Sequence, residues 1–541
     1  MNEKKLVLIL DAQLPYVRKA DLPGTVEESW FFHALTFTYL PLLRSFTALE
    51  TEGVPFYAAV AFSPQLTEML ADPLLQIRYT EHLDASIRYA EQILSGGLPG
   101  VPGETWKKAA AIHLDLLQKN RRDFTEIYEK NILKKFDYFS ERGYLELMAT
   151  AATPCFFPFY KDIPEVVNAQ IETGLMAHRM HFASIPDGFW LPALGWFPGV
   201  EKSLKAYGFR YSAVENIAFL FSESPPPAGV FAPAVCGNGF YLFPRDSFAS
   251  TELYGEPGGR CFHPAYLDVN RDIGFELDGK TLEPLFDLTL GRRVTGFRCM
   301  ARGVPEKSGA SSSVLYDPDA AARQVEADAA AFLDAGSGML SKASSFLEGE
   351  PVCRTCAFPA SLFGCSWYEG VAWLESVFRQ AAARDDISFA RPSFFLSKRG
   401  TEKPKNPPPV SPVFSSWFEN GYADELLNGA NDWIYPYLRK ASERMVDLAE
   451  RFPGDGGLKE RVLNTAARAL FLAQSLDWPL MMNDPVNAEY ARSSFEENIR
   501  AFTTVYESLG SNFVSTEWLT EMERKQRLFP FMNYRVFSRR K

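Results

Sequence analysis

Short apolar runs alternate with segments of helical periodicity along the N-terminal part of the chain. The runs typical of buried strands span residues 6–10, 56–62, 144–149, 188–191 and 211–214. Between the second and third runs, apolar side chains recur at helical spacing over residues 105–140, which predicts either two helices or one long amphipathic helix. Strands that alternate with helices in this way are typical of a parallel sheet or barrel.

The C-terminal part of the chain has a different pattern. Residues 400–413 contain repeated prolines, which cannot continue a helix or a central strand, so we expect a linker there. Helical periodicity follows over residues 440–451, 458–476, 487–508 and 514–527. The pattern therefore predicts a β/α domain over residues 1–399, the linker over 400–413 and a helical domain over 414–541.

Charge and hydropathy exclude several classes of partner. Lys and Arg number 56 against 67 Asp and Glu, a formal charge of -11 that disfavours nucleic acid and anionic membranes. No apolar stretch approaches the ~18 residues of a membrane span, and the run at residues 6–10 is shorter than the ~7–15 apolar residues of an export signal. We expect a cytoplasmic protein that contacts neither membranes nor nucleic acid.

The cysteines and histidines do not predict a metal site. The seven cysteines are scattered, which fits reduced thiols. Cys353 and Cys356 form one CxxC pair without a second pair nearby, so we expect ordinary loop cysteines. His178 and His181 are more simply explained as residues on a helix face. We therefore expect no metal and no cofactor.

Short motifs occur in a fixed order over almost the whole chain. They lie at residues 14–18, 28–30, 39–43, 63–64, 74–75, 190–192, 245–246, 316–318, 362–364, 367–370, 415–417 and 477–479. Each match alone is weak, but the ordered series resembles glycoside hydrolase family 57, and within it the α-glucan branching enzyme group. The resemblance implies an incomplete (β/α)7 barrel with an inserted helical element and an all-helical C-terminal domain against the active-site mouth.

The two catalytic positions that the resemblance implies have lost their carboxyl groups. Retaining sugar transfer needs a nucleophile and an acid/base about 5–5.5 Å apart, and both are carboxyl groups. The family nucleophile directly follows Trp-Leu-Pro, where this chain has Ala193. The family acid/base lies four residues before the Phe-Gly pair, where this chain has Pro359. Neither side chain can supply the chemistry.

Neighbouring family positions have changed as well. The two family histidines before Leu-Pro-Tyr are replaced by Asp11 and Gln13, and nearby Glu and His positions hold Ser361 and Cys365. Losing catalytic residues that act as a unit costs ~10⁴–10⁶ in rate. Asp11, at the end of the first strand, is the carboxylate that we favour for a rescue of catalysis. Asp246 and Glu369 are further candidates, but both fit the family pattern outside the catalytic pair, which favours a structural or sugar-binding role.

Binding can survive the loss of catalysis. The residues that the resemblance implies for sugar binding are Trp190, Arg245, Asp246, Trp367, Trp417 and Trp478. We favour a cleft position for Trp417 and a structural role for Trp190, since a buried Trp also stabilises a core.

The leading hypothesis from the sequence is a catalytically inactive relative of 1,4-α-glucan branching enzyme. Such a protein binds α-glucan, either glycogen or a maltooligosaccharide, or a partner protein of carbohydrate metabolism. Two alternatives stay open. One is an active branching enzyme or transglycosylase that uses displaced carboxylates, and the other is a protein-protein scaffold.

Overall fold

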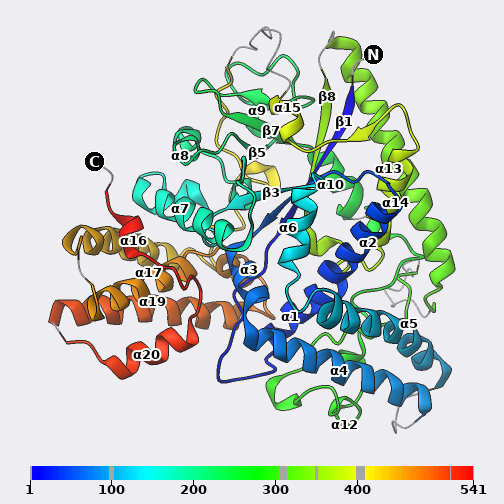
Figure 1. The fold of residues 1–541 in the computed structure, drawn as a ribbon, viewed down its shortest axis with the longest axis horizontal. Coiled ribbons are helices and arrows are strands. Elements are labelled where there is room, and N and C mark those ends of the chain that lie inside the picture. Colours follow the sequence, from blue (N-terminus) through cyan, green and yellow to red (C-terminus); the bar gives the residue numbers. More distant parts are fainter. Residues whose placement is uncertain are drawn as a thin grey trace.

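The computed structural model describes residues 3–96, 103–256, 258–303, 314–347, 351–397, 409–454, 456–511 and 513–539. Figure 1 shows strands surrounded by helices, with the C-terminal helices gathered on one side. Residues 400–408 of the predicted linker lie outside the described residues, so the domain boundaries stay a prediction. Each described helix is too short or too polar to cross a membrane.

Seven parallel strands form a closed ring within the described residues. They are β1 (Lys4–Ala12), β2 (Ala58–Phe62), β3 (Leu145–Thr150), β4 (Gly188–Trp190), β5 (Tyr211–Glu215), β7 (Tyr241–Arg245) and β8 (Val352–Pro359). β1 closes the ring because it pairs with both β2 and β8. Two short strands lie outside it: β6 (Ala234–Val235) pairs with β7, and β9 (Ser388–Phe389) pairs with β1. The expected (β/α)7 barrel is confirmed.

The five predicted strands all form, whereas β7 and β8 have no clear signal in the sequence. β7 contains Pro244, and β8 carries the buried Arg354. Cys353 and Cys356 lie on β8, so the expectation of loop cysteines is wrong. Their side chains face opposite sides of the strand, Cys353 toward the barrel interior and Cys356 toward the surrounding helices.

The inserted helical element lies between β2 and β3. It consists of α3 (Pro64–Ala71), α4 (Pro73–Ser95), α5 (Gly103–Arg122) and α6 (Leu133–Glu141). Of the two alternatives for residues 105–140, two helices is right, because α5 ends before a π-helical turn at Asp123–Ile127 and α6 begins at Leu133. Ser63 and Asp72 cap α3 and α4 in front of a proline at the first helical position, a sequence that favours helix starts.

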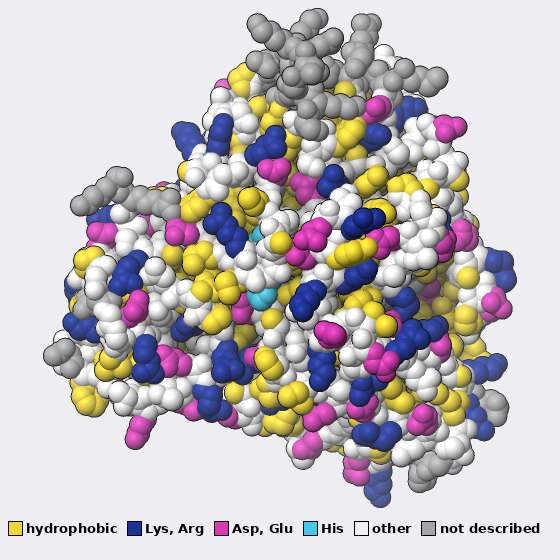
Figure 2. All heavy atoms as spheres, in the orientation of Figure 1, with side chains coloured by type: hydrophobic (Ala, Val, Ile, Leu, Met, Phe, Trp, Pro, Cys, Tyr) yellow, Lys and Arg dark blue, Asp and Glu magenta, His cyan; other side chains and the backbone are white. Residues whose placement is uncertain are grey.

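The remaining long helices surround the barrel. They are α1 (Val26–Ala34), α2 (Leu40–Thr51), α7 (Pro164–His181), α8 (Val200–Ala206), α10 (Ser247–Tyr254), α13 (Pro318–Phe346) and α14 (Gly370–Ala382). Figure 2 shows acidic and basic side chains interspersed over the face of the molecule seen in that view.

The C-terminal helices pack on the barrel through a shared core. They are α16 (Ile434–Arg451), α17 (Leu458–Ala473), α18 (Asp477–Met482), α19 (Ala488–Ser511) and α20 (Thr516–Lys525). Buried side chains of α7, α16 and α17 belong to one hydrophobic cluster with residues of β4 and β5. Buried hydrogen bonds cross the same contact, with Gln170 Nε2 2.9 Å from Gln474 Oε1 and Thr153 Oγ1 2.7 Å from the Phe471 carbonyl. This packing holds the segment before α18 close to the loops that follow the barrel strands.

Candidate functional site

A cleft lies where the carboxyl ends of the barrel strands meet α18. It is lined by Asp11, Gln13, Ser63, Thr150, Ala151, Pro154, Trp190, Pro192, Ala193, Pro359, Ser361, Trp417, Leu476, Asp477 and Leu480. Its volume is about 150 Å³, smaller than the ~300–1,000 Å³ typical of small-molecule sites. We call it the strand-end cleft. Functional residues of β/α barrels gather at this end because the loops there converge on one point.

Ala193 and Pro359, the two positions at which the resemblance implies catalytic carboxyl groups, both line the strand-end cleft. Pro359 is the last residue of β8 and is the register partner of Asp11 on β1. Ala193 follows β4 in a left-handed conformation with φ 51°, and its carbonyl accepts a hydrogen bond of 2.9 Å from the Trp417 backbone N–H. Of the described residues that line the cleft, only Asp11 and Asp477 carry a carboxyl group.

Asp11 faces the interior of the barrel. Val7 and Ile9, four and two residues earlier on β1, belong to the interior cluster, and the alternation of side chains along a strand puts Asp11 on the same side. Removal of water by the surrounding protein raises the pKa of Asp11 to about 7. Interaction with the Trp190 indole lowers this pKa, and the negative charge of Asp477 raises it. Asp11 is therefore partly protonated at neutral pH.

Asp477, the second carboxyl group of the cleft, begins α18. Its Oδ1 accepts a hydrogen bond of 2.8 Å from Gln13 Nε2, and its Oδ2 accepts one of 2.6 Å from Ser475 Oγ. Burial raises the pKa of Asp477 to about 6, against the effect of these two donors. The sequence pattern points to this segment through Trp478 and does not indicate Asp477 as a cleft residue. No local signal marks it, because its partner Gln13 is far away in the sequence.

The two cleft tryptophans differ in burial. Trp190 is 1% exposed, whereas Trp417 is half-buried, and their rings meet edge to face with centroids 5.9 Å apart. The guanidinium group of Arg245 lies 6.0 Å from the Trp417 ring centroid. Trp417 is thus held between Trp190 and Arg245, and it contributes the more accessible aromatic surface to the cleft.

Arg245 and Asp246 form ion pairs and do not line the cleft. Arg245 Nη1 lies 2.6 Å from Glu215 Oε2, and both side chains are buried. Asp246 pairs with Arg354 and accepts a hydrogen bond of 2.9 Å from the Phe248 backbone N–H, which caps α10. Any role of these two residues in sugar binding stays a prediction.

Trp367 and Trp478 are both 1% exposed and lie outside the cleft lining. Trp367 packs in the core, with its ring centroid 5.4 Å from those of Tyr266 and Trp373. Trp478 donates from Nε1 to the Leu472 carbonyl at 2.6 Å and borders a neighbouring pocket. The sequence does not separate these two residues from Trp417, because all three lie in motifs of the same series.

Two other candidate groups, Glu369 and Cys365, do not add a reactive side chain to the strand-end cleft. Glu369 is 5% exposed and accepts a hydrogen bond of 3.0 Å from the Leu267 backbone N–H, and it does not line the cleft. Burial raises the pKa of the Cys365 thiol to about 11, so it stays protonated at neutral pH. The described residues contain no group of three or more His, Cys, Asp or Glu side chains that could hold a metal ion.

Comparisons with known proteins give the family. The sequence model of glycosyl hydrolase family 57 matches residues 7–254, and that of the C-terminal region of 1,4-alpha-glucan branching enzyme matches residues 437–537. The crystal structure of the alpha-amylase AmyC from Thermotoga maritima superposes with a TM-score of 0.90 at 30% sequence identity, over 100% of both chains. The chain belongs to glycosyl hydrolase family 57.

Two further relatives are branching enzymes. The 1,4-alpha-glucan branching enzyme TK1436 of Thermococcus kodakarensis is 26% identical over 90% of this chain and 71% of its own length. The structure of the family 57 branching enzyme from Pyrococcus horikoshii has a TM-score of 0.84 at 24% identity, over 99% of this chain and 97% of that one. The second likeness concerns the fold alone.

Proposed function

We propose that this protein is a non-catalytic member of family 57 that binds the end of an α-glucan chain in the strand-end cleft. One observation carries the proposal: Ala193 and Pro359 occupy the cleft where the resemblance implies the two catalytic carboxyl groups. A methyl group and a pyrrolidine ring can neither attack an anomeric carbon nor donate a proton. α-Glucans as the ligand follow from the names of the branching enzyme relatives.

The composition of the cleft supports a neutral sugar ligand. Trp417 offers an aromatic surface on which a sugar ring can stack, and Ser63, Thr150 and Ser361 supply hydroxyl groups among the lining residues. The small volume fits one end of a chain better than a long internal segment. The formal charge of -11 gives no electrostatic reason for a nucleic acid or an anionic membrane as partner.

Affinity electrophoresis in glycogen-containing native gels tests binding. We expect glycogen to retard the wild-type protein and Trp417→Ala to weaken the retardation strongly. Trp518→Ala, on α20 and outside the cleft lining, is the matched control that leaves it unchanged. Absence of retardation in the wild type contradicts the proposal. It favours the scaffold hypothesis, in which the protein binds a partner protein.

A second function is favoured by one specific observation. Asp11 and Asp477 line the same cleft, and each carboxyl group has a raised pKa, as general acids often do. On this alternative the protein is an active glucan-transferring enzyme that uses displaced carboxylates. An iodine-stained amylose assay distinguishes the two. We expect no turnover, and activity that disappears in Asp11→Asn, in a preparation free of host amylase, would establish the enzyme instead.

A further inference from the structure

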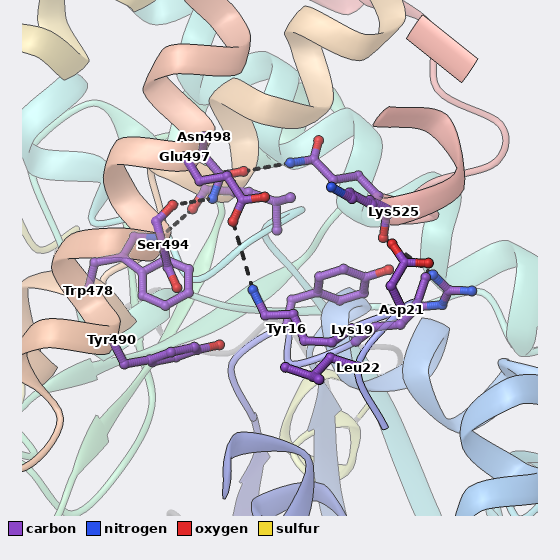
Figure 3. A pocket seen from close by; sticks show the side chains of 14 residues that line it. Tyr16, Lys19, Asp21, Leu22, Trp478, Tyr490, Ser494, Glu497, Asn498 and Lys525 are labelled. Carbon is purple, nitrogen blue, oxygen red and sulfur yellow. Dashed lines mark hydrogen bonds and ion pairs between the residues drawn. The ribbon is translucent and has the colours of Figure 1, made fainter. Parts of the chain in front are cut away.

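A second cavity lies next to the strand-end cleft, between the loop after β1 and the C-terminal helices (Figure 3). It is lined by Tyr16, Arg18, Lys19, Ala20, Asp21, Leu22, Leu472, Trp478, Tyr490, Ser494, Glu497, Asn498, Lys525 and Gln526. Its volume is about 280 Å³, close to the lower end of the ~300–1,000 Å³ of small-molecule sites. We call it the Gln526 pocket. The glucan binding proposed for the strand-end cleft does not use it.

The two cavities share wall segments. Gln13 and Asp477 line the strand-end cleft, whereas Tyr16 and Trp478, three residues and one residue further along the chain, line the Gln526 pocket. The two cavities therefore border the same two segments of the chain.

A buried hydrogen-bond acceptor lines the Gln526 pocket. Gln526 is 9% exposed, and its Nε2 donates to Asn498 Oδ1 at 2.9 Å, while Asn498 Nδ2 donates to the Ser494 carbonyl at 2.8 Å. These two bonds fix the orientation of the Gln526 amide. Its Oε1 is buried and has no hydrogen-bond partner within the described part of the chain. Buried polar atoms are nearly always paired, so a ligand hydroxyl that reaches this oxygen would complete its hydrogen bonding.

The charged residues around the pocket are already paired within the protein. Lys19 Nζ lies 3.8 Å from Glu497 Oε2 across the pocket wall. Asp21 pairs with Arg524, and Lys525 lies 3.1 Å from a carboxylate oxygen of Glu521. An anionic ligand such as a phosphate would have to break these pairs. The charge distribution therefore favours a neutral ligand.

Aromatic rings form one side of the pocket. Figure 3 shows Trp478, Tyr490 and Ser494 on one side and Asp21 and Lys525 on the other. The Tyr490 ring is half-buried and is held edge to face by Trp478, with centroids 6.0 Å apart. A flat ring beside fixed amides and a hydroxyl suits a molecule that has both an apolar face and several hydroxyl groups.

We propose that the Gln526 pocket binds a neutral sugar ring, one glucose unit of an α-glucan, at a site separate from the strand-end cleft. The choice of an α-glucan rests on the proposed function, whereas the preference for a neutral polyhydroxylated ring follows from the pocket itself.

Fluorine NMR of the full chain labelled with 5-fluorotryptophan tests the proposal, with Trp417→Phe and Trp478→Phe used to assign the two signals. On titration with maltoheptaose we expect the Trp417 and Trp478 signals both to shift. A shift at Trp417 alone overturns the second site and leaves the proposed function standing. A shift at Trp478 alone supports the second site and contradicts binding in the cleft, and no shift at either contradicts both.

Variants of the pocket separate direct binding from an effect transmitted through α18. Gln526→Leu keeps the size of the side chain and removes the acceptor, so we expect about tenfold weaker binding at the Trp478 signal with the Trp417 signal unchanged. Ser494→Phe, which fills the cavity, should abolish the Trp478 shift even if Gln526→Leu folds poorly. Gln118→Leu, on the exposed surface of α5, is the matched control. Equal binding in all four proteins, wild type included, overturns the proposal.

Discussion

Asp11 and Pro359 lie side by side as register partners near the carboxyl ends of the parallel strands β1 and β8. A carboxyl group introduced at position 359 would therefore lie beside the Asp11 carboxyl. Asp477 already interacts electrostatically with Asp11 in the same cleft. This arrangement disfavours an ionised carboxylate at position 359, because like charges close together cannot all ionise.

The first prediction concerns restoration of the two family carboxyl groups. Ala193→Glu combined with Pro359→Asp should give no branching or hydrolysis of amylose in an iodine-stained assay. Two larger side chains enter a cleft of about 150 Å³, and Gln13, Ser361 and Cys365 still differ from the family pattern. Recovery of activity by this pair alone would show that the cleft is still organised for transfer. The two single variants serve as controls.

The second prediction concerns pH and stability. The pKa of Asp11 is raised from 3.8 to about 7, so the folded protein binds this proton more tightly than the unfolded chain does. The resulting stabilisation is complete below pH ~3.8 and is lost as pH rises through about 7, by at most about 4 kcal/mol. Asp11→Asn should remove the part of the pH dependence that comes from Asp11, and it should raise the free energy of unfolding at pH 8 relative to wild type.

Urea denaturation at pH 5 and pH 8 measures this effect. Asp424→Asn, at an exposed position, is the control that should change neither value. Asp477, with its pKa raised to about 6, adds a smaller loss in the same direction, so the Asp11→Asn protein keeps part of the slope. A wild-type stability equal at both pH values would contradict the raised pKa of both carboxyl groups.

The third prediction separates the two cleft tryptophans. Trp190 is 1% exposed, so Trp190→Ala should lower the free energy of unfolding by ~3–5 kcal/mol. Trp417 is half-buried, so Trp417→Ala should lower it by only about 1 kcal/mol while strongly weakening retardation by glycogen. Thermal denaturation and native gels give the two readouts. Equal loss of stability in both variants would argue against a binding role for Trp417.

The fourth prediction concerns the buried Arg245–Glu215 pair. Arg245→Met leaves the Glu215 carboxylate buried without its partner and should destabilise the protein by roughly 3–5 kcal/mol. The double variant Arg245→Met with Glu215→Leu should recover about half of that loss or more, because it removes the unpaired charge as well. Chemical denaturation of the three variants measures both steps. A mild effect of Arg245→Met alone would free this residue for a role in ligand binding.

The pattern of apolar and polar residues along the chain was enough to predict most of the helices and strands. Five barrel strands and the long C-terminal helices follow from apolar periodicity, because each such segment buries one face or both against the core. The apolar pattern did not predict β7 and β8, because Pro244 and Arg354 interrupt it. In the folded protein Arg354 is buried through its ion pair with Asp246, a contact that no local window contains.

The sequence by itself determined the fold class and the family resemblance, and that resemblance implies catalytic carboxyl groups where the chain has Ala193 and Pro359. Only the tertiary structure decided which side chains share the cleft. It brought Asp477 beside Gln13, and it placed Trp367 in the core and Trp478 against a different pocket. The physical reason is that periodicity is set by neighbours in the chain, whereas the cleft forms where a closed barrel and a distant helix meet.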